Sequence, residues 1–221
     1  MPRPEKGKNF QMIGENEFLR GVDMLQLSFE REKIHKLKIY AELLEKWNKV
    51  YNLTGLKNKS QWWTHHFLDS LSIVEFVRGN SLVDIGTGAG LPGVVLAIAF
   101  PAKQVTLVDS NQKKGVFLKE VAATIGLNNI KVITKRVEHF HHNPGFSFIV
   151  SRAFSNLATF LKLGSHLCVS DGIMVAMKGK LDKKECASVP TECLLRVVPL
   201  DVPFLKENRN LVFMNPMRKE G

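Results

Sequence analysis

The sequence has few cysteines, few acids and no long apolar run, and each shortage excludes a class of protein. Its three cysteines are odd in number and lack C-x-x-C spacing, so we expect reduced, mostly buried thiols rather than a disulfide framework. No run of about 18 apolar residues is present, which argues against a membrane helix. The basic, polar start lacks the apolar segment of a signal peptide. We therefore expect a cytoplasmic protein.

Acids are outnumbered by bases, 21 against 31, which leaves a net charge of +10. The excess is concentrated in residues 111–136, with a net charge of +5, and in residues 178–184, with +3. Single lysines there could simply be solvated, but the sums favour a polyanion surface. Lys113 and Lys114 are candidate RNA contacts within the first stretch.

The rest of the chain is organised around residues 81–93, where an apolar run ends in an acid and then becomes glycine-rich. A helix-length apolar run follows, so the order is strand, glycine loop, helix. Gly88, Gly90 and Gly93 satisfy G-x-G-x-x-G, and Asp109 closes the next apolar run about 20 residues later. This pattern predicts a nucleotide-type ligand.

The charge of Asp84, at the mouth of that loop, favours one ligand over another. It would repel the pyrophosphate that a dinucleotide places on a helix N-terminus. S-adenosylmethionine has no phosphate and carries an ammonium and a sulfonium, which an acid favours. Asp109 can accept from the ribose hydroxyls of either ligand. Two alternatives remain open, an oxidoreductase that uses a nicotinamide cofactor and a non-enzymatic RNA-binding module.

From residue 81 onward apolar runs alternate with helical patterns, which is the rhythm of a parallel sheet. We expect strands at 81–85, 104–109, 130–134, 147–150, 173–178, 194–198 and 211–215, and helices at 93–100, 111–125 and 156–168. Five parallel strands and a terminal hairpin predict an α/β fold, the doubly wound seven-stranded, Rossmann-like sheet of S-adenosylmethionine-dependent methyltransferases. We expect a flexible tail at 1–14, an N-terminal helical extension at 15–79 and a methyltransferase domain at 80–221.

In the extension, helical periodicity begins at Glu15, resumes after Ser28 and returns over residues 60–77. His66 and Asp69 are three residues apart in the third helix, so they share a face. They form either a local hydrogen-bonded pair or part of the border of the substrate pocket.

The loop after the fourth strand limits the kinds of methyl transfer that the chain could catalyse. Exocyclic-amine methylases have Asn or Asp, then Pro-Pro and an aromatic residue, at this place, whereas this chain has Ser151-Arg152-Ala153-Phe154. Arg152 can reach a phosphate, a guanine edge or a cofactor carboxylate, or form a structural salt bridge. No cysteine follows a strand in a recognisable loop, which argues against a cysteine nucleophile. The histidines at 139–142 precede Asn-Pro-Gly and indicate a solvated turn rather than a metal site.

Several short motifs occur together in one order. They are Asn52-Leu-Thr54, His66-x-x-Asp69-Ser70, Asp84-Ile-Gly86-Thr-Gly88-x-Gly90-Leu-Pro-Gly93, Asp109-Ser110, Arg136-Val-Glu138, Ser151-Arg152-Ala-Phe154 and Lys178-Gly179. The combination resembles the bacterial ribosomal RNA small subunit methyltransferase G family, formerly called glucose-inhibited division protein B, over about residues 28–215. The chain departs from that pattern in its extended N-terminus and in His65, where another basic residue is expected.

The resemblance implies methylation of guanine N7 at position 527, in the 530 loop of 16S ribosomal RNA, with S-adenosylmethionine as cofactor. Implied cofactor contacts are Gly86, Leu91, Val137, Glu138 and Arg152. The charge argument adds Asp84 and Asp109, and the loop adds Gly88 and Gly90. Expected substrate contacts are Asn52, His66, Asp69, Lys113 and Lys114. Arg152 and Lys178 are the candidate catalytic residues that hold the nucleotide. We expect a monomer without a metal that acts on 16S rRNA or the 30S subunit.

Overall fold

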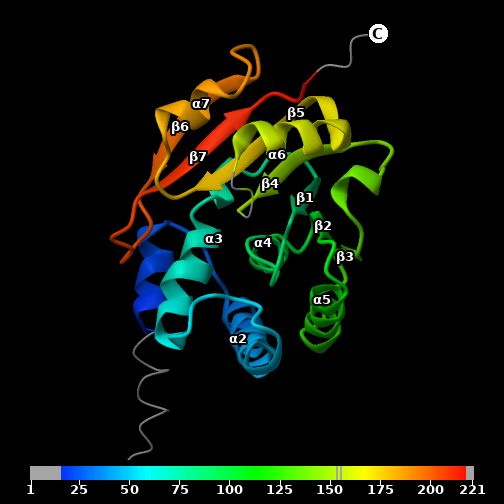
Figure 1. Ribbon diagram of the computed structural model, residues 1–221. Coiled ribbons are helices and arrows are strands. Elements are labelled where there is room, and N and C mark those ends of the chain that lie inside the picture. Colours follow the sequence, from blue (N-terminus) through cyan, green and yellow to red (C-terminus); the bar gives the residue numbers. More distant parts are fainter. Residues whose placement is uncertain (1–15, 153, 155, 218–221) are drawn as a thin grey trace, which may run out of the picture.

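The computed structural model describes residues 16–152, 154 and 156–217, and the tail expected at 1–14 lies outside that range. Its centre is a seven-stranded sheet in the order β3-β2-β1-β4-β5-β7-β6 (Figure 1). The strands are β1 (Ser81–Ile85), β2 (Gln104–Val108), β3 (Ile130–Ile133), β4 (Phe146–Ser151), β5 (Cys168–Lys178), β6 (Leu194–Leu200) and β7 (Arg209–Met214). The first five pair in parallel, and β7 is antiparallel to both β5 and β6. This arrangement confirms the predicted fold class.

Most of the sheet is buried on both faces, and alternate side chains of its central strands enter different cores. In β5, Met174 and Ala176 enter one core while Val175 and Met177 enter the other. The helices α4 (Gly93–Ala99) and α5 (Gln112–Thr124) cover one face, and α6 (Leu157–Gly164) and α7 (Lys183–Ala187) lie on the other (Figure 1). The carboxyl ends of β1 and β4, where the strand order reverses, lie between these layers.

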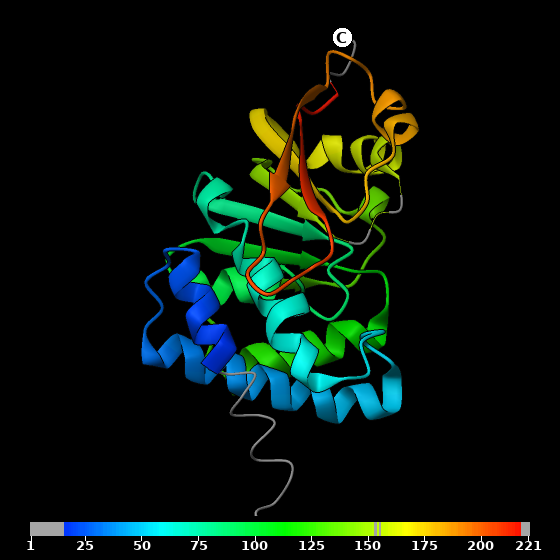
Figure 2. The same cartoon turned by 90° about the vertical axis from the view of Figure 1, so that its left-hand side faces the viewer.

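The helical extension shares the core of the first face. It begins with a helix at residues 16–24 and continues with α2 (Arg31–Tyr51), whose buried residues Leu37, Tyr40 and Leu44 follow helical spacing. Figure 2 shows α2 lying lengthwise across the base of the molecule, and α2 contacts both α4 and α5. In the part of the chain described, no helix combines the length and the hydropathy that crossing a membrane would require.

The prediction of one continuous helix over residues 60–77 is wrong in one respect: the structure divides this segment into short helical pieces. They are η1 (Lys59–Gln61), the π-helical η2 (Trp63–Leu68), α3 (Asp69–Leu71) and η3 (Val74–Phe76). The Ser72 hydroxyl donates a hydrogen bond to the carbonyl of Asp69 at 2.7 Å, and this bond competes with regular helical hydrogen bonding. A π-helical turn changes which side chains face the sheet, and such turns are frequent at functional sites.

Candidate active site

The loop between β1 and α4 is shaped by glycines in the left-handed region. Gly86, Gly88 and Gly90 have φ values of 68°, 60° and 98°. A Cβ built on Gly88 would meet no protein atom closer than 3.9 Å, so this part of the loop borders open space. A Cβ on Gly93 would collide with the side chain of Leu107, so Gly93 is needed for helix and strand to pack closely.

Asp84 is fully buried beneath this loop, whereas the sequence placed it at the loop mouth. Its Oδ2 accepts from the Thr87 hydroxyl at 2.7 Å and from the Gly93 amide at 2.8 Å. Its Oδ1 is buried and has no hydrogen-bond partner among the described residues. Burial raises the pKa of this carboxyl from 3.8 to about 6, although both hydrogen bonds oppose the rise. One carboxylate oxygen therefore organises the loop, and the other is left unsatisfied.

Asp109, at the end of β2, connects the loop to α5. Its Oδ2 accepts from the Gly88 amide at 2.9 Å and from Lys114 Nζ at 3.3 Å. Its Oδ1 accepts from the amide of Asn111, whose side chain caps α5 by accepting from two amides. The predicted cofactor acid is thus held against the predicted glycine loop.

A cavity of about 390 Å³ lies at the carboxyl ends of β4 and β5, where the sheet faces the helical extension. Its lining residues come from four separate parts of the chain. They are Leu56, His65, His66, Asp69, Arg152, Met177, Lys178, Gly179 and Arg209. The cavity therefore brings the predicted substrate residues His66 and Asp69 together with the predicted catalytic residues Arg152 and Lys178.

Asp69 is the centre of the charge network in this cavity, which we call the arginine pocket. Its Oδ2 accepts from Arg152 Nη1 and its Oδ1 from Arg209 Nε, both at 2.9 Å. The Asp69 side chain is 1% exposed, whereas those of Arg152 and Arg209 are 23% and 21% exposed. One buried acid thus orients two arginines that both reach solvent.

The hydrogen-bond partner of His66 is not Asp69, so the local His66–Asp69 pair that their spacing allowed is not what the structure shows. The Nε2 of His66 lies 2.8 Å from the Thr54 hydroxyl, and the Thr54 amide donates to Asn48 at 2.8 Å. Burial, followed by the charge of Arg152, lowers the pKa of His66 from 6.5 to about 3. The imidazole is therefore neutral at physiological pH.

This lowered pKa predicts acid sensitivity that depends on His66. Below pH 6.5 the unfolded chain binds a proton that the folded protein does not take up until about pH 3, so stability falls as pH falls. Between pH 7.5 and 5.5 this group should remove about 1 kcal/mol of unfolding free energy. His66→Gln should lessen that loss in urea unfolding, while substitution of the exposed His35 by Gln should leave it unchanged. Equal losses in wild type and His66→Gln would contradict the assignment.

The chain matches a family model and several curated relatives. The family model GidB, rRNA small subunit methyltransferase G, matches residues 33–212. The relative named ribosomal RNA small subunit methyltransferase G in Nitrosococcus oceani is 40% identical over 207 residues, which cover 93% of this chain and 97% of the relative. Its namesake in Methylobacillus flagellatus is 43% identical over 194 residues, covering 88% and 94%. The chain belongs to this family.

Solved structures agree on the fold of this member of the methyltransferase G family. A SAM-dependent methyltransferase from Aquifex aeolicus matches with a TM-score of 0.55 at 18% identity, over 77% of this chain and 97% of that one. The ribosomal protein L11 methylase of Lactobacillus delbrueckii subsp. bulgaricus matches with 0.55 at 17% identity, over 73% and 81%. The predicted family and enzyme class are confirmed, and the solved structures that share the fold include a SAM-dependent methyltransferase.

The two predicted catalytic residues of this methyltransferase are already engaged with protein groups. Arg152 donates to the carbonyl of His65 at 3.1 Å as well as to Asp69. Lys178 donates to the carbonyl of Phe154 at 3.2 Å and lies 2.7 Å from a carboxylate oxygen of Glu185. Both side chains line the arginine pocket, and their contact with a nucleotide stays a prediction.

The other predicted contacts surround the loop and the pocket at different depths. Asn52 ends α2 in the left-handed conformation that asparagine tolerates, and it is exposed. Lys113 is exposed, with its ammonium 5.2 Å from the centre of the Tyr51 ring. After β3, Val137 is buried and Glu138 exposed within η4 (Val137–His139). Their contacts with cofactor or RNA stay predictions.

Two residues of the site, Arg209 and Tyr40, were missed from the sequence. Arg209 lies 140 positions from its partner Asp69, so no local pattern indicates the pair. The Tyr40 hydroxyl donates to the carbonyl of Ala89 in the glycine loop at 2.6 Å. A buried tyrosine on a helix usually needs such a partner, which is the one signal that could have identified Tyr40.

Neither the cysteines nor the histidines of residues 139–142 line the arginine pocket. Cys193 is buried while Cys168 and Cys186 are half-buried, and all three are free thiols. Burial raises the pKa of each thiol, for Cys168 to about 12, which weakens any nucleophile. The described residues contain no cluster of three or more His, Cys, Asp or Glu that could hold a metal ion. His142 instead stacks on Phe146 with ring centres 4.5 Å apart.

Proposed function

We propose that this protein transfers the methyl group of S-adenosylmethionine to guanine N7 at position 527 of 16S rRNA, in the 530 loop. The observation that carries the proposal is the arginine pocket, which lies at the carboxyl edge of a methyltransferase sheet. Membership of the methyltransferase G family supports the same reaction class. The pocket supplies cationic groups for a nucleotide on the side of the sheet where this fold binds ligands.

The glycine loop fits S-adenosylmethionine better than a dinucleotide. The α4 amide that would face a pyrophosphate already donates to the Asp84 carboxylate, so a phosphate there would meet a negative charge. The unsatisfied Oδ1 of Asp84 suits a cationic ligand, and the space beside Gly88 admits one. Asp109 would accept from the ribose hydroxyls, with Gly86, Gly88, Gly90 and Leu91 around the ligand and Val137 and Glu138 by its adenine.

The protein's residues have mainly to align the nucleotide and exclude water. When bound, S-adenosylmethionine supplies a methyl group on a sulfonium centre. Guanine N7 presents a lone pair without a proton, so no residue has to remove one. His66, neutral because of its lowered pKa, can then contribute hydrogen bonding and shape rather than charge. Arg152 and Arg209 retain exposed surface with which to hold the phosphate or the base edge.

The target has to be presented outside a regular duplex. In A-form RNA the groove edge that carries N7 is deep and narrow, so the base must lie in a loop or leave its stack. The basic stretches at 111–136 and 178–184 would contact the surrounding phosphates. We propose 16S rRNA, free or within the 30S subunit, as the partner, recognised by one copy of the chain. Asn52, Lys113 and Lys114 are the proposed outer contacts.

Incubation with methyl-tritiated S-adenosylmethionine and 30S subunits from cells that lack this protein tests the proposal. Label in 7-methylguanosine at position 527 is expected. Arg152→Ala should lower the rate roughly 100-fold or more, and Lys178→Ala roughly tenfold, because both groups position the nucleotide. Lys46→Ala removes the same charge from an exposed side chain on α2, outside the pocket and outside both basic stretches, and should change the rate less than about twofold.

Each component of the proposal can fail separately in this assay. Label in another nucleoside would overturn the N7 assignment, and no label despite cofactor binding would overturn the proposed substrate. Equal rates for Arg152→Ala, Lys178→Ala and Lys46→Ala would remove the pocket from the mechanism. Thermal unfolding of each variant distinguishes lost positioning from lost folding, since Lys178 also pairs with Glu185.

A further inference from the structure

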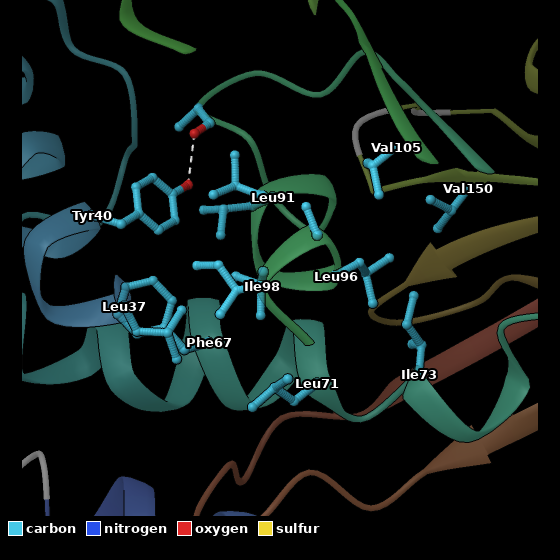
Figure 3. Packing of buried hydrophobic residues seen from close by; sticks show 14 of the residues in the cluster. Leu37, Tyr40, Phe67, Leu71, Ile73, Leu91, Leu96, Ile98, Val105 and Val150 are labelled. Atoms are coloured by element: carbon cyan, nitrogen blue, oxygen red, sulfur yellow. Dashed lines mark hydrogen bonds between the residues drawn. The ribbon is translucent and has the colours of Figure 1, made fainter. Parts of the chain in front are cut away.

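One hydrogen bond links the helical extension directly to the glycine loop. The hydroxyl of Tyr40, on α2, donates to the carbonyl of Ala89 at 2.6 Å (Figure 3). Tyr40 is completely buried and Ala89 is 5% exposed, so water does not compete for this carbonyl. Ala89 lies between Gly88 and Gly90, which both have positive φ.

The remaining support of the loop comes from the sheet side. The amides of Gly86 and Thr87 donate to the carbonyl of Val108, at 2.8 and 3.1 Å, and the Gly88 amide donates to Asp109. Among the described residues, the Tyr40 hydroxyl is the group of the extension that hydrogen-bonds this loop. Removal of the Tyr40 hydroxyl would leave the buried Ala89 carbonyl without this donor. Such a loss costs more free energy than the loss of a solvent-exposed hydrogen bond.

Tyr40 is itself held in place by aromatic neighbours on two elements. Its ring centre lies 5.7 Å from that of Phe67 in η2 and 6.3 Å from that of Phe117 in α5. Burial raises the pKa of the phenol above its ordinary value of 10, so the hydroxyl keeps its proton and remains a donor. The donor is thus fixed in position and in protonation state.

We propose that Tyr40 is a positioning residue for cofactor binding: it fixes the Ala89 peptide so that the loop keeps the open space beside Gly88. The inference rests on the proposed role of this loop in binding S-adenosylmethionine. Because Phe67 precedes Asp69 by two residues in the same helical segment, the contact also connects the loop to the support of the arginine pocket. Tyr40 itself touches no reacting atom.

The test is Tyr40→Phe, which keeps the ring and removes only the hydroxyl. The dissociation constant of S-adenosylmethionine, measured by calorimetry, should rise roughly 5- to 20-fold, since a buried hydrogen bond is lost from the bound conformation. The methylation rate at saturating cofactor should stay within about twofold, because the aligned loop is restored once cofactor is bound. Amide hydrogen exchange of Gly90 and Leu91 should accelerate while that of β1 does not.

Trp47→Phe is the matched control, because it also removes one hydrogen bond made by α2. Trp47 Nε1 donates to Glu120 at 3.1 Å on α5, away from the loop. This variant should lower thermal stability at least as much as Tyr40→Phe but leave the dissociation constant within about twofold. Equally weakened S-adenosylmethionine binding in both variants, or unchanged binding in Tyr40→Phe, would overturn the positioning role. Wild type that binds no S-adenosylmethionine would instead refute the proposed function.

Discussion

Asp84→Asn is expected to stabilise the ligand-free protein at pH 7.5 by about 1–2 kcal/mol and to weaken S-adenosylmethionine binding at least tenfold. The substitution keeps the shape of the side chain and one oxygen for Thr87 and Gly93, but it removes a buried negative charge. That charge is costly for folding because Oδ1 has no partner among the described residues. A cationic ligand would offset the cost, which is why the variant should bind it poorly.

The raised pKa of Asp84 explains why the substitution should increase stability at pH 7.5. Between pH 3.8 and about 6 the folded protein holds a proton that the unfolded chain has lost, so this group lowers stability as pH rises through that interval. The rise corresponds to about 3 kcal/mol above pH 6. Unsatisfied amide hydrogens in the variant cost about 1–2 kcal/mol of that gain.

Urea unfolding of both proteins between pH 4 and 8 measures this effect, and calorimetry gives the affinity. Relative to wild type, Asp84→Asn should be slightly less stable near pH 4, should gain stability as pH rises to about 6, and should keep a constant advantage above that pH. Thr87→Val serves as a control in the opposite sense, because it removes a hydroxyl that lowers the Asp84 pKa, and it should destabilise the protein at pH 7.5. Lower stability of Asp84→Asn at every pH would disprove the unfavourable buried charge.

Asp69→Ala is expected to lower the unfolding free energy by about 2–4 kcal/mol and to abolish measurable methylation. The substitution leaves Arg152 and Arg209 facing one another without their shared carboxylate. Breaking a fully buried pair costs about 3–5 kcal/mol, and the partial exposure of both arginines reduces the penalty here. The loss of activity follows from misplaced arginines rather than from contact between Asp69 and the substrate.

A second substitution separates stability from activity in this network. Arg209→Met added to Asp69→Ala removes one of the two repelling cations, so part of the lost stability should return while methylation stays absent. Urea unfolding and 7-methylguanosine analysis at 20 °C give the two readouts. Methylation restored together with stability would show that the pocket geometry does not depend on Asp69. Unchanged stability in Asp69→Ala alone would refute the shared ion pair.

The sheet was predictable from sequence because buried parallel strands appear as apolar runs. The run at Ser81–Ile85 coincides with β1, and the run predicted at 104–109 with β2 to within one residue. The start of β5 was missed by five residues, because its first part contains the exposed Ser170 and Asp171 rather than an apolar run. Hydrophobic periodicity therefore locates core strands better than strand extensions at the surface.

The site was predictable where its residues adjoin strand ends and not where distant groups meet. Arg152 follows β4 and Lys178 ends β5, so topology alone placed them at one edge of the sheet. The hydrophobic periodicity of α2 did not identify Tyr40 as a site residue, because the role of Tyr40 depends on its bond to a backbone carbonyl that no sequence pattern indicates. The burial of Asp84 was missed because sequence shows the order of strand and loop but not which atoms cover them.

The position of Arg209 has a consequence for biosynthesis. Arg209 opens β7, which inserts between β5 and β6. A nascent chain whose β7 segment is still inside the ribosome therefore has Asp69 and Arg152 but lacks the second arginine. The pocket proposed to modify ribosomal RNA is therefore completed only after the segment that carries Arg209 has been synthesised and has left the ribosome.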